Sequence, residues 1–209
     1  MSGPEGPWLE WARQLQALAQ TGGAYDAHPY HAERYERVGR IAAEMMAAGF
    51  GEAVQAIEES FAAEAGHATP KVDVRAAAFR GEELLLVRER ISGLWTLPGG
   101  WADPGDSPAE SAVREAQEES GYSLRATKLV ALHDRERRGY GPVRWYTYKV
   151  TFLCALLPGE PREHDHEVLE VGFFGEHALP ALDLNRTAPQ LVELCFAHLR
   201  DASLPTDFD

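Results

Sequence analysis

The sequence predicts a layered α/β domain preceded by a small helical unit. Strand-like runs are concentrated after residue 70, with helical segments among them. Mixed strands and helices are typical of domains in which helices cover a sheet. The first 66 residues show only helical periodicity, and a short linker follows them at 66–70. We therefore expect a helical domain at 1–66 and an α/β domain at 67–209.

Three helices account for the N-terminal segment. The first is expected to stop at residues 21–23, which read Thr-Gly-Gly; the second follows Pro29 and ends at Gly49; the third ends near Gly66. Each carries an apolar stripe that predicts core or interface packing, and none has the spacing of a catalytic site. The first two stripes contain Trp8, Trp11, Leu15 and Leu18, and then Tyr35, Val38, Ile41, Ala42 and Met45.

The α/β segment is expected to begin with a hairpin, with strands at 72–79 and 83–87 and a turn at Arg80-Gly81. A short extended stretch at 94–97 precedes a glycine-rich loop. A helix is predicted from Ser107 to Ser120. Further strands are expected at 124–132, 145–157 and 168–174, and a closing helix at 187–199.

The composition limits the range of partners. The formal net charge is −13, so nucleic acid is not an expected partner, and a phosphate substrate would need a cation as intermediary. Cys154 and Cys195 lie in apolar stretches, which predicts buried, reduced thiols. We find no run of about 18 apolar residues and no basic, apolar leader, so we expect a cytoplasmic protein without membrane contact.

Residues 99–122 carry the chemistry and read GGWADPGDSPAESAVREAQEESGY. The glycines predict a loop in which the backbone approaches another group closely. Ser107 and Glu110 form a capping-box pattern at the helix start, with Pro108 at the first helical position. Gly121 is expected to end the helix.

Three glutamates, Glu115, Glu118 and Glu119, fall on one side of this helix. Their carboxylates repel one another, and Arg114 relieves part of the repulsion. A divalent cation would relieve more, because Mg²⁺ prefers carboxylate, carbonyl and phosphate oxygens. The alternative is a solvated acidic helix after an ordinary loop, which the glutamates alone would favour.

The ordered string resembles the Nudix box, which runs Gly, five residues, Glu, seven residues, Arg-Glu, an aliphatic, any residue, Glu-Glu, any residue, Gly and an aliphatic. Its positions fall here on Gly100, Asp106, Arg114, Glu115, Ala116, Glu118, Glu119, Gly121 and Tyr122. Asp106 stands where the box has a glutamate, which leaves its own role open. Ala116 and Tyr122 are weak versions of the aliphatic positions.

Further stretches are similar to one Nudix subgroup, the hydrolases of nucleoside diphosphates linked to a group X. They are WLEWARQLQALAQTG, DAHPYHAERYERVGRIAAEMMA, LWTLPGGWADPGDSP and EVGFFGEHALPAL. The subgroup includes CDP-choline pyrophosphatases and ADP-ribose-type hydrolases. The resemblance implies a Nudix α/β/α sandwich with a three-helix N-terminal domain that supports dimerisation or the substrate site, and a homodimer.

The resemblance also implies the reaction and the metal site. We expect Mg²⁺-dependent, or Mn²⁺-dependent, hydrolysis of the pyrophosphate to a nucleoside monophosphate and X-phosphate. Glu115 and Glu119 would be the principal metal ligands, Glu118 a further ligand, direct or through water, and the Gly99 carbonyl would complete the set. Arg114 would orient the glutamates.

Two questions stay open at this point. The general base is either a helix glutamate, Glu115 or Glu118, or a later acid, for which Glu167 is the candidate; a polar turn is the other reading of Glu167. Arg88 and Trp101 are candidate substrate contacts, with surface charge and packing as their alternatives.

Other functions compete with the main one. Another Nudix activity, on nucleoside triphosphates or RNA ends, is the first, although the acidic surface disfavours RNA. A non-catalytic Nudix sensor is the second, but the chain has no basic recognition helix and retains all three glutamates. The sequence names neither the base nor the group X.

Overall fold

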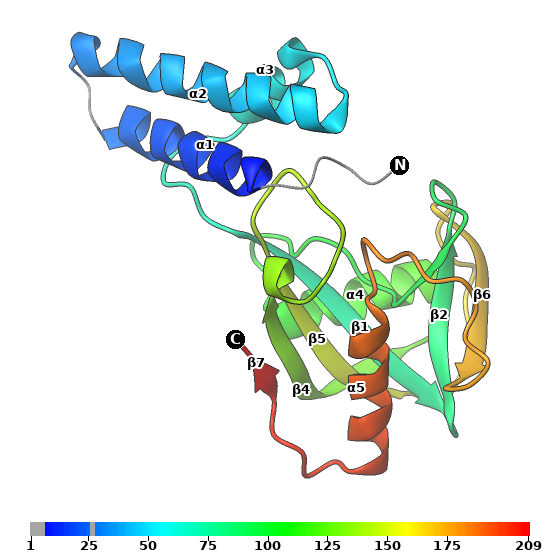
Figure 1. Ribbon diagram of the computed structural model, residues 1–209. Coiled ribbons are helices and arrows are strands. Elements are labelled where there is room, and N and C mark those ends of the chain that lie inside the picture. The colour runs from blue at the N-terminus through cyan, green and yellow to red at the C-terminus, as the bar shows by residue number, and fades with distance from the viewer. Residues whose placement is uncertain (1–6, 26–27) are drawn as a thin grey trace. The chain divides into compact units, whose positions relative to one another are not determined.

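The computed structural model describes residues 7–25 and 28–209, so positions 1–6 and 26–27 of the expected first domain lie outside the described residues. The chain divides into two compact units. One comprises Met1–Pro70 together with Pro142–Tyr146, and the other comprises Lys71–Gly141 and Thr147–Asp209. Figure 1 shows the helices of the first unit and the sheet of the second. None of the described helices combines the length and apolar character needed to cross a membrane.

The helical unit contains α1 (Trp8–Tyr25), α2 (Pro29–Phe50) and α3 (Val54–Ala62). The expected ends of the first two helices are wrong: α1 runs through Gly22, and α2 runs through Gly49 to a left-handed Gly51 cap with φ of 71°. Both internal glycines are packing positions. A Cβ on Gly22 would lie 2.2 Å from the Tyr35 ring, and a Cβ on Gly49 would lie 2.0 Å from the Trp8 ring.

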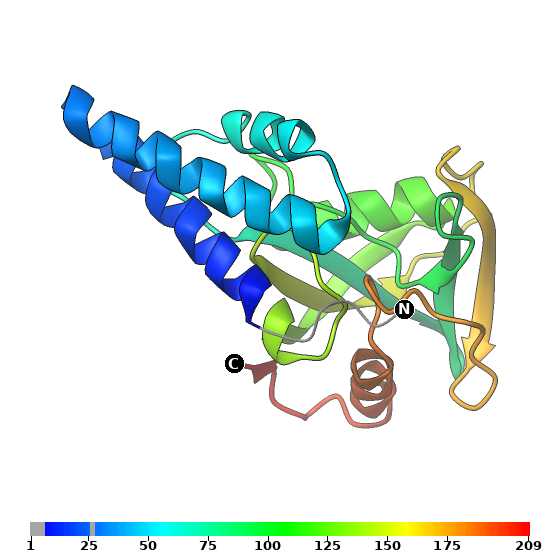
Figure 2. The ribbon, with the colours of Figure 1, turned by 45° about the horizontal axis from the view of Figure 1, so that its top comes forward.

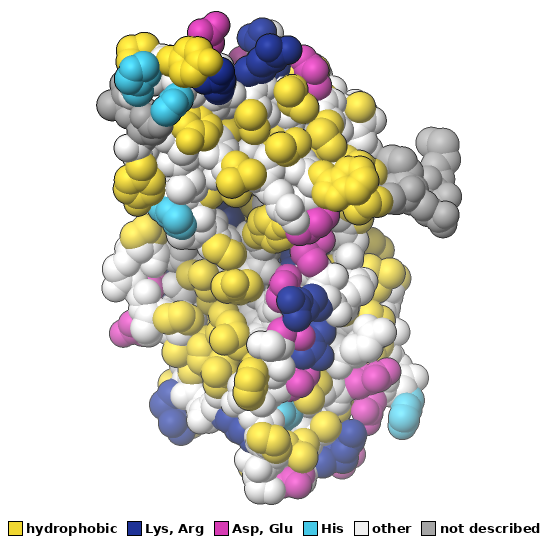
Figure 3. Space-filling view, turned by 60° about the vertical axis from the view of Figure 1, so that its left-hand side comes forward, with side chains coloured by type: hydrophobic (Ala, Val, Ile, Leu, Met, Phe, Trp, Pro, Cys, Tyr) yellow, Lys and Arg dark blue, Asp and Glu magenta, His cyan; other side chains and the backbone are white. Residues whose placement is uncertain are grey.

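The core of the helical unit differs from the predicted stripes. It consists of Leu9, Ala12, Ala43, Met46, Ala47 and Ile57. Trp11, Leu18 and Ile41 were expected in the stripes but are 55%, 64% and 42% exposed. Figure 3 shows hydrophobic side chains spread over the face of this unit that is in view. Two members of the first predicted stripe, Trp11 and Leu18, therefore lie on the surface, whereas Trp8 packs against the core.

The second unit is built on a mixed sheet of seven strands. They are β1 (Lys71–Arg80), β2 (Glu83–Glu89), β3 (Trp95–Thr96), β4 (Leu124–Asp134), β5 (Thr147–Leu156), β6 (Val168–Gly175) and β7 (Asp207–Phe208). The order is β3-β2-β1-β5-β4-β7, and β6 pairs with β2. β1 and β2 form the predicted hairpin, and β1 runs parallel to β5. Neither β7 nor the 3-10 turn η1 (Arg135–Arg137) was predicted from the sequence.

Two helices cover opposite faces of this sheet, α4 (Pro108–Ser120) and α5 (Pro189–Arg200). Alternation along β1 sends Ala76 and Ala78 to a cluster with Ala116 of α4, and Ala77 to a cluster with Phe196 of α5. Figure 2 shows α4 and α5 on the two sides of the strands. The unit is an α/β/α sandwich, as expected. Both cysteines are buried and free, as expected.

Candidate active site

The α4 helix begins and ends where the sequence predicts. Ser107 accepts a hydrogen bond from the Glu110 backbone N–H at 3.3 Å, and the Glu110 carboxylate accepts one from the Ser107 N–H at 2.8 Å. This is the predicted capping box. Gly121 caps the other end with φ of 74°. A Cβ there would lie 2.1 Å from the Arg162 carbonyl oxygen, so the following loop also requires glycine.

The glycine loop meets α4 at two points. Gly99 has φ of 140°, and a Cβ on it would lie 2.0 Å from the Val74 carbonyl oxygen of β1. Its N–H donates a hydrogen bond of 2.8 Å to the Glu119 carboxylate. A Cβ on Gly100 would lie 2.7 Å from a carboxylate oxygen of Glu115. The absence of side chains at these glycines lets two glutamates of α4 approach the loop backbone.

Glu119 is a buried carboxylate, 8% exposed. Burial raises its pKa to about 7, although the charge of Arg75 and the hydrogen bond from Gly99 partly oppose this; Glu89 and Glu115 raise it further. Burial also raises the pKa of Glu115 above its ordinary range, while Arg114 lowers it. Both glutamates thus lie where the anionic form is costly without a nearby cation.

Arg114 binds four carboxylates at once. Its guanidinium donates to Asp103 at 2.8 Å, Asp106 at 3.1 Å, Glu115 at 2.8 Å and Glu118 at 3.3 Å. Asp106 therefore reaches the arginine in spite of its shorter side chain. Asp103 was not singled out from the sequence, although it lies three residues before Asp106 in the same loop. One positive charge faces four negative ones, so the group stays strongly anionic.

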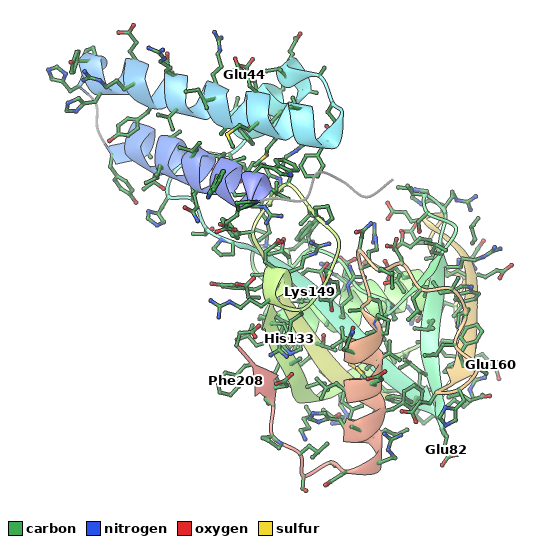
Figure 4. The ribbon with its side chains drawn as sticks, viewed as in Figure 1. Glu44, Glu82, His133, Lys149, Glu160 and Phe208 are labelled. Carbon is green, nitrogen blue, oxygen red and sulfur yellow. The ribbon has the colours of Figure 1, made fainter. Side chains whose placement is uncertain are left out.

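A buried charge cluster lies beneath the loop, on β1 and β5. Asp73 accepts hydrogen bonds from Arg75 at 2.7 Å and 2.9 Å and from Lys149 at 2.6 Å. Burial alone would raise the pKa of Asp73, but the two cations lower it to about 2. Arg75 also donates to the Leu97 carbonyl at 2.9 Å, two residues before Gly99. Figure 4 labels Lys149 on β5. These three residues were not predicted from the sequence as part of the site.

The remaining predicted residues make no hydrogen bond or ion pair with the α4 glutamates among the described residues, although the Trp101 backbone forms a β-bridge with Asp73. Arg88 forms an ion pair of 2.7 Å with Glu170. Trp101 is 54% exposed. Glu167 is exposed, and among the described residues no hydrogen bond or ion pair joins its side chain to the α4 glutamates. Its loop does reach α4, because the Asp165 N–H donates to the Glu118 carbonyl at 2.8 Å.

The donor types fit a hard divalent cation. Carboxylates crowd around one guanidinium, Glu119 has no direct cationic contact among the described residues, and carboxylate oxygens are the ligands that Mg²⁺ prefers. The side chains are not arranged as a ready ligand set: no group of three or more His, Cys, Asp or Glu in the described chain has metal-binding geometry. The carboxylates of Glu115 and Glu118 are directed to Arg114 instead.

Comparison with known proteins identifies the family. A family model described as the NUDIX domain matches residues 69–195, and one described as the UDP-X-like, N-terminal oligomerisation domain matches residues 6–61. The Bacillus subtilis (strain 168) protein named "Putative ADP-ribose pyrophosphatase YjhB" is 39% identical over 202 residues, 97% of each chain.

Two solved structures agree with this. A crystal structure of an ADP-ribose pyrophosphatase from Streptococcus suis 89-1591 is 38% identical, with a TM-score of 0.61, and covers 68% of this chain and 100% of its own. A crystal structure of a UDP-X diphosphatase is 27% identical, with a TM-score of 0.60, and covers 97% of this chain and 98% of its own.

The chain belongs to the Nudix family and is a Nudix hydrolase, a pyrophosphohydrolase with a UDP-X-like N-terminal domain. This confirms the resemblance that the box residues indicated. Members of this family typically depend on a divalent metal ion.

Proposed function

We propose that this chain hydrolyses the pyrophosphate bond of ADP-ribose, or of a closely related nucleoside diphosphate conjugate, to a nucleoside monophosphate and X-phosphate. The observation that carries the substrate class is similarity over 97% of the chain to a protein named for ADP-ribose. The UDP-X diphosphatase structure, similar over the same share of the chain, supports the wider class of conjugates.

A divalent metal ion would be held by Glu115, Glu118, Glu119 and the carbonyl of Gly99, and would supply charge neutralisation and activation of water. Arg114 holds two of these glutamates, Glu115 and Glu118, through its hydrogen bonds. The hydrogen bond from the Gly99 N–H to Glu119 ties the glycine loop to the helix that carries these glutamates, which supports the assignment. Pyrophosphate cleavage relies on this kind of positioning and electrostatic stabilisation.

The experiment is a hydrolysis panel with Mg²⁺, repeated with Mn²⁺. It contains ADP-ribose, a UDP-sugar, CDP-choline, a dinucleoside polyphosphate, CTP and the deoxynucleoside triphosphates. Glu119→Gln is the test variant, and Glu82→Gln, an exposed glutamate in the β1–β2 turn, is the matched control. We expect ADP-ribose to be cleaved best and Glu119→Gln alone to lose activity. Preferred cleavage of a triphosphate would reject the proposal, and binding without turnover would indicate a sensor.

The general base can be assigned in the same assay. Glu115, Glu118 and Glu167 are the candidates. Glutamine at the residue that acts as base should lower kcat and remove the acidic limb of its pH profile. Glutamine at the others should leave the shape of the profile unchanged.

We further propose that the enzyme is a homodimer joined through the helical unit. Trp11, Leu18 and Tyr25 follow one another at intervals of seven residues on α1 and are 55%, 64% and 74% exposed. Heptad spacing of exposed apolar residues suits association with a second helix. The family model that matches this unit is described as an oligomerisation domain, which supports the same conclusion.

A further inference from the structure

Arg186 lies on a segment that is fastened to the glycine loop. The segment before α5 pairs with β3, where the Asp183 N–H donates to the Trp95 carbonyl at 2.8 Å. Thr187 then accepts a hydrogen bond of 2.9 Å from the Leu97 N–H. Thr187 is fully buried, so this junction is firmly placed. Arg186 therefore stands beside the stretch that leads directly into Gly99.

A buried acid anchors Arg186. Its guanidinium donates to Glu89 at 2.7 Å, and Glu89 is 5% exposed. The charge of Glu89 acts on both Glu119 and Arg75, so Glu89 lies within electrostatic range of the candidate metal site. The Arg186 side chain itself is 39% exposed. The ion pair thus has one buried partner, Glu89, and one partner that solvent reaches, Arg186.

Two other arginines around the site are more fully engaged within the protein. Arg114 is shared among four carboxylates. Arg75 is 2% exposed and bonded to Asp73 and to a backbone carbonyl. Arg88 resembles Arg186 in having one acidic partner, but that partner, Glu170, is exposed, whereas Glu89 is buried.

Arg186 differs from Arg114 and Arg75, because Glu89 is the one hydrogen-bond partner of its guanidinium among the described residues. Guanidinium groups bind phosphate oxygens through paired N–H donors. The enzyme carries a formal net charge of −13, so a pyrophosphate needs local cations to approach the acidic helix.

We propose that Arg186 binds a phosphate group of the substrate and that Glu89 is its positioning residue. The identity of the whole substrate rests on the proposed function, whereas the binding of a phosphate group by Arg186 does not depend on it. Arg186 holds the substrate, whereas the α4 glutamates act on the bond that breaks. Its loss should therefore affect KM more than kcat.

Two readouts on the full-length protein test this. The first is steady-state hydrolysis of ADP-ribose with Mg²⁺. The second is calorimetric binding of imidodiphosphate, a non-hydrolysable pyrophosphate analogue that carries no nucleoside. The variants are Arg186→Gln, Arg186→Lys and Glu89→Gln. The matched control is Arg200→Gln, which removes the exposed arginine at the end of α5 that pairs with Glu176.

We expect Arg186→Gln to raise KM and weaken imidodiphosphate binding by about tenfold each, with kcat changed by less than about threefold. Arg186→Lys should recover part of the loss, Glu89→Gln should show an intermediate loss, and Arg200→Gln should resemble wild type. If Arg186→Gln fails to fold because Glu89 is left unpaired, the Glu89→Gln/Arg186→Gln double variant replaces it, since it removes the buried charge as well.

Wild-type binding of imidodiphosphate by Arg186→Gln would overturn the inference, and so would an absence of imidodiphosphate binding by the wild type. Failure of the proposed function is a separate outcome. In that case the wild type would cleave no nucleoside diphosphate conjugate, yet would bind imidodiphosphate through Arg186.

Discussion

The backbone N–H of Gly99 donates a hydrogen bond of 2.8 Å to the carboxylate of Glu119, which joins the glycine loop to α4. The two residues are twenty positions apart in the chain. The contact places the buried Glu119 carboxylate against the backbone of the glycine loop, which has no side chains at Gly99 and Gly100.

Gly99→Ala should disrupt the loop. The added Cβ would lie 2.0 Å from the Val74 carbonyl oxygen, and φ of 140° is strained for any residue with a side chain. We expect a loss of about 3 kcal/mol or more in the free energy of unfolding, measured in urea, and a loss of activity. Gly23→Ala is the control: a Cβ there meets nothing within 4 Å and lies in α1, so it should be neutral or stabilising. Equal stability of the two variants would contradict the geometry.

Glu119 should make the metal-free enzyme less stable as the pH rises. Burial raises its pKa from 4.5 to about 7, so between these values the folded protein binds more protons than the unfolded chain. The stabilisation is fully present below the unfolded pKa of 4.5 and is lost as the pH rises through the folded pKa of about 7. Glu119→Gln removes this dependence. Urea unfolding is measured in EDTA from about pH 5 to about pH 8. Over this range the free energy of unfolding should fall more for the wild type than for Glu119→Gln, by on the order of 3 kcal/mol. Parallel curves for the two proteins would refute this.

Arg114→Gln should lower activity by about tenfold or more, because Asp103, Asp106, Glu115 and Glu118 would lose their common cation and move apart. The activity of Arg114→Lys should lie between that of the wild type and that of Arg114→Gln. Lysine keeps the positive charge, but its ammonium group lacks the planar guanidinium that can bind several carboxylates. The measurement is kcat as a function of Mg²⁺ concentration. Activity of Arg114→Gln equal to that of Arg200→Gln would show that Arg114 does not order the site.

Leu18→Glu should convert the proposed homodimer to a monomer. The residue is 64% exposed in the heptad-spaced stripe of α1, so a charge there costs little in the isolated chain but much in an apolar interface. Light scattering after size exclusion gives the mass. Ile91→Glu is the control, because Ile91 is 93% exposed in a turn of the Nudix unit. A wild-type monomer, or a dimer that survives Leu18→Glu, would exclude the stripe as the interface.

Local patterns predicted the parts of the fold that depend on neighbouring residues. Ser107 and Glu110 mark the start of α4 and Gly121 its end, because capping uses residues close in the chain. The same reasoning failed at Gly22 and Gly49. These glycines occur inside helices because aromatic rings from elsewhere in the unit occupy the space of a side chain. A distant contact outweighs the usual role of glycine as a helix terminator.

The residues of the candidate site likewise fall into those that the sequence predicted and those that it did not. The box residues could be found because their spacing along one helix determines which side chains share a face. Asp73, Lys149, Glu89 and Arg186 could not be found, because they come from strands and a loop up to about a hundred residues apart and meet only in the folded sheet. Nothing in their local sequence separates them from ordinary strand and loop charges.

Hydrolysis of the pyrophosphate bond can be followed by the oxygen atom that water adds to one of the two products. ADP-ribose is incubated with the enzyme and Mg²⁺ in ¹⁸O-labelled water, and the products are weighed by mass spectrometry. We predict AMP and ribose 5-phosphate, with one ¹⁸O atom in one of the two products and none in the other. Unchanged ADP-ribose, or release of free adenine or inorganic phosphate without AMP, would contradict the account.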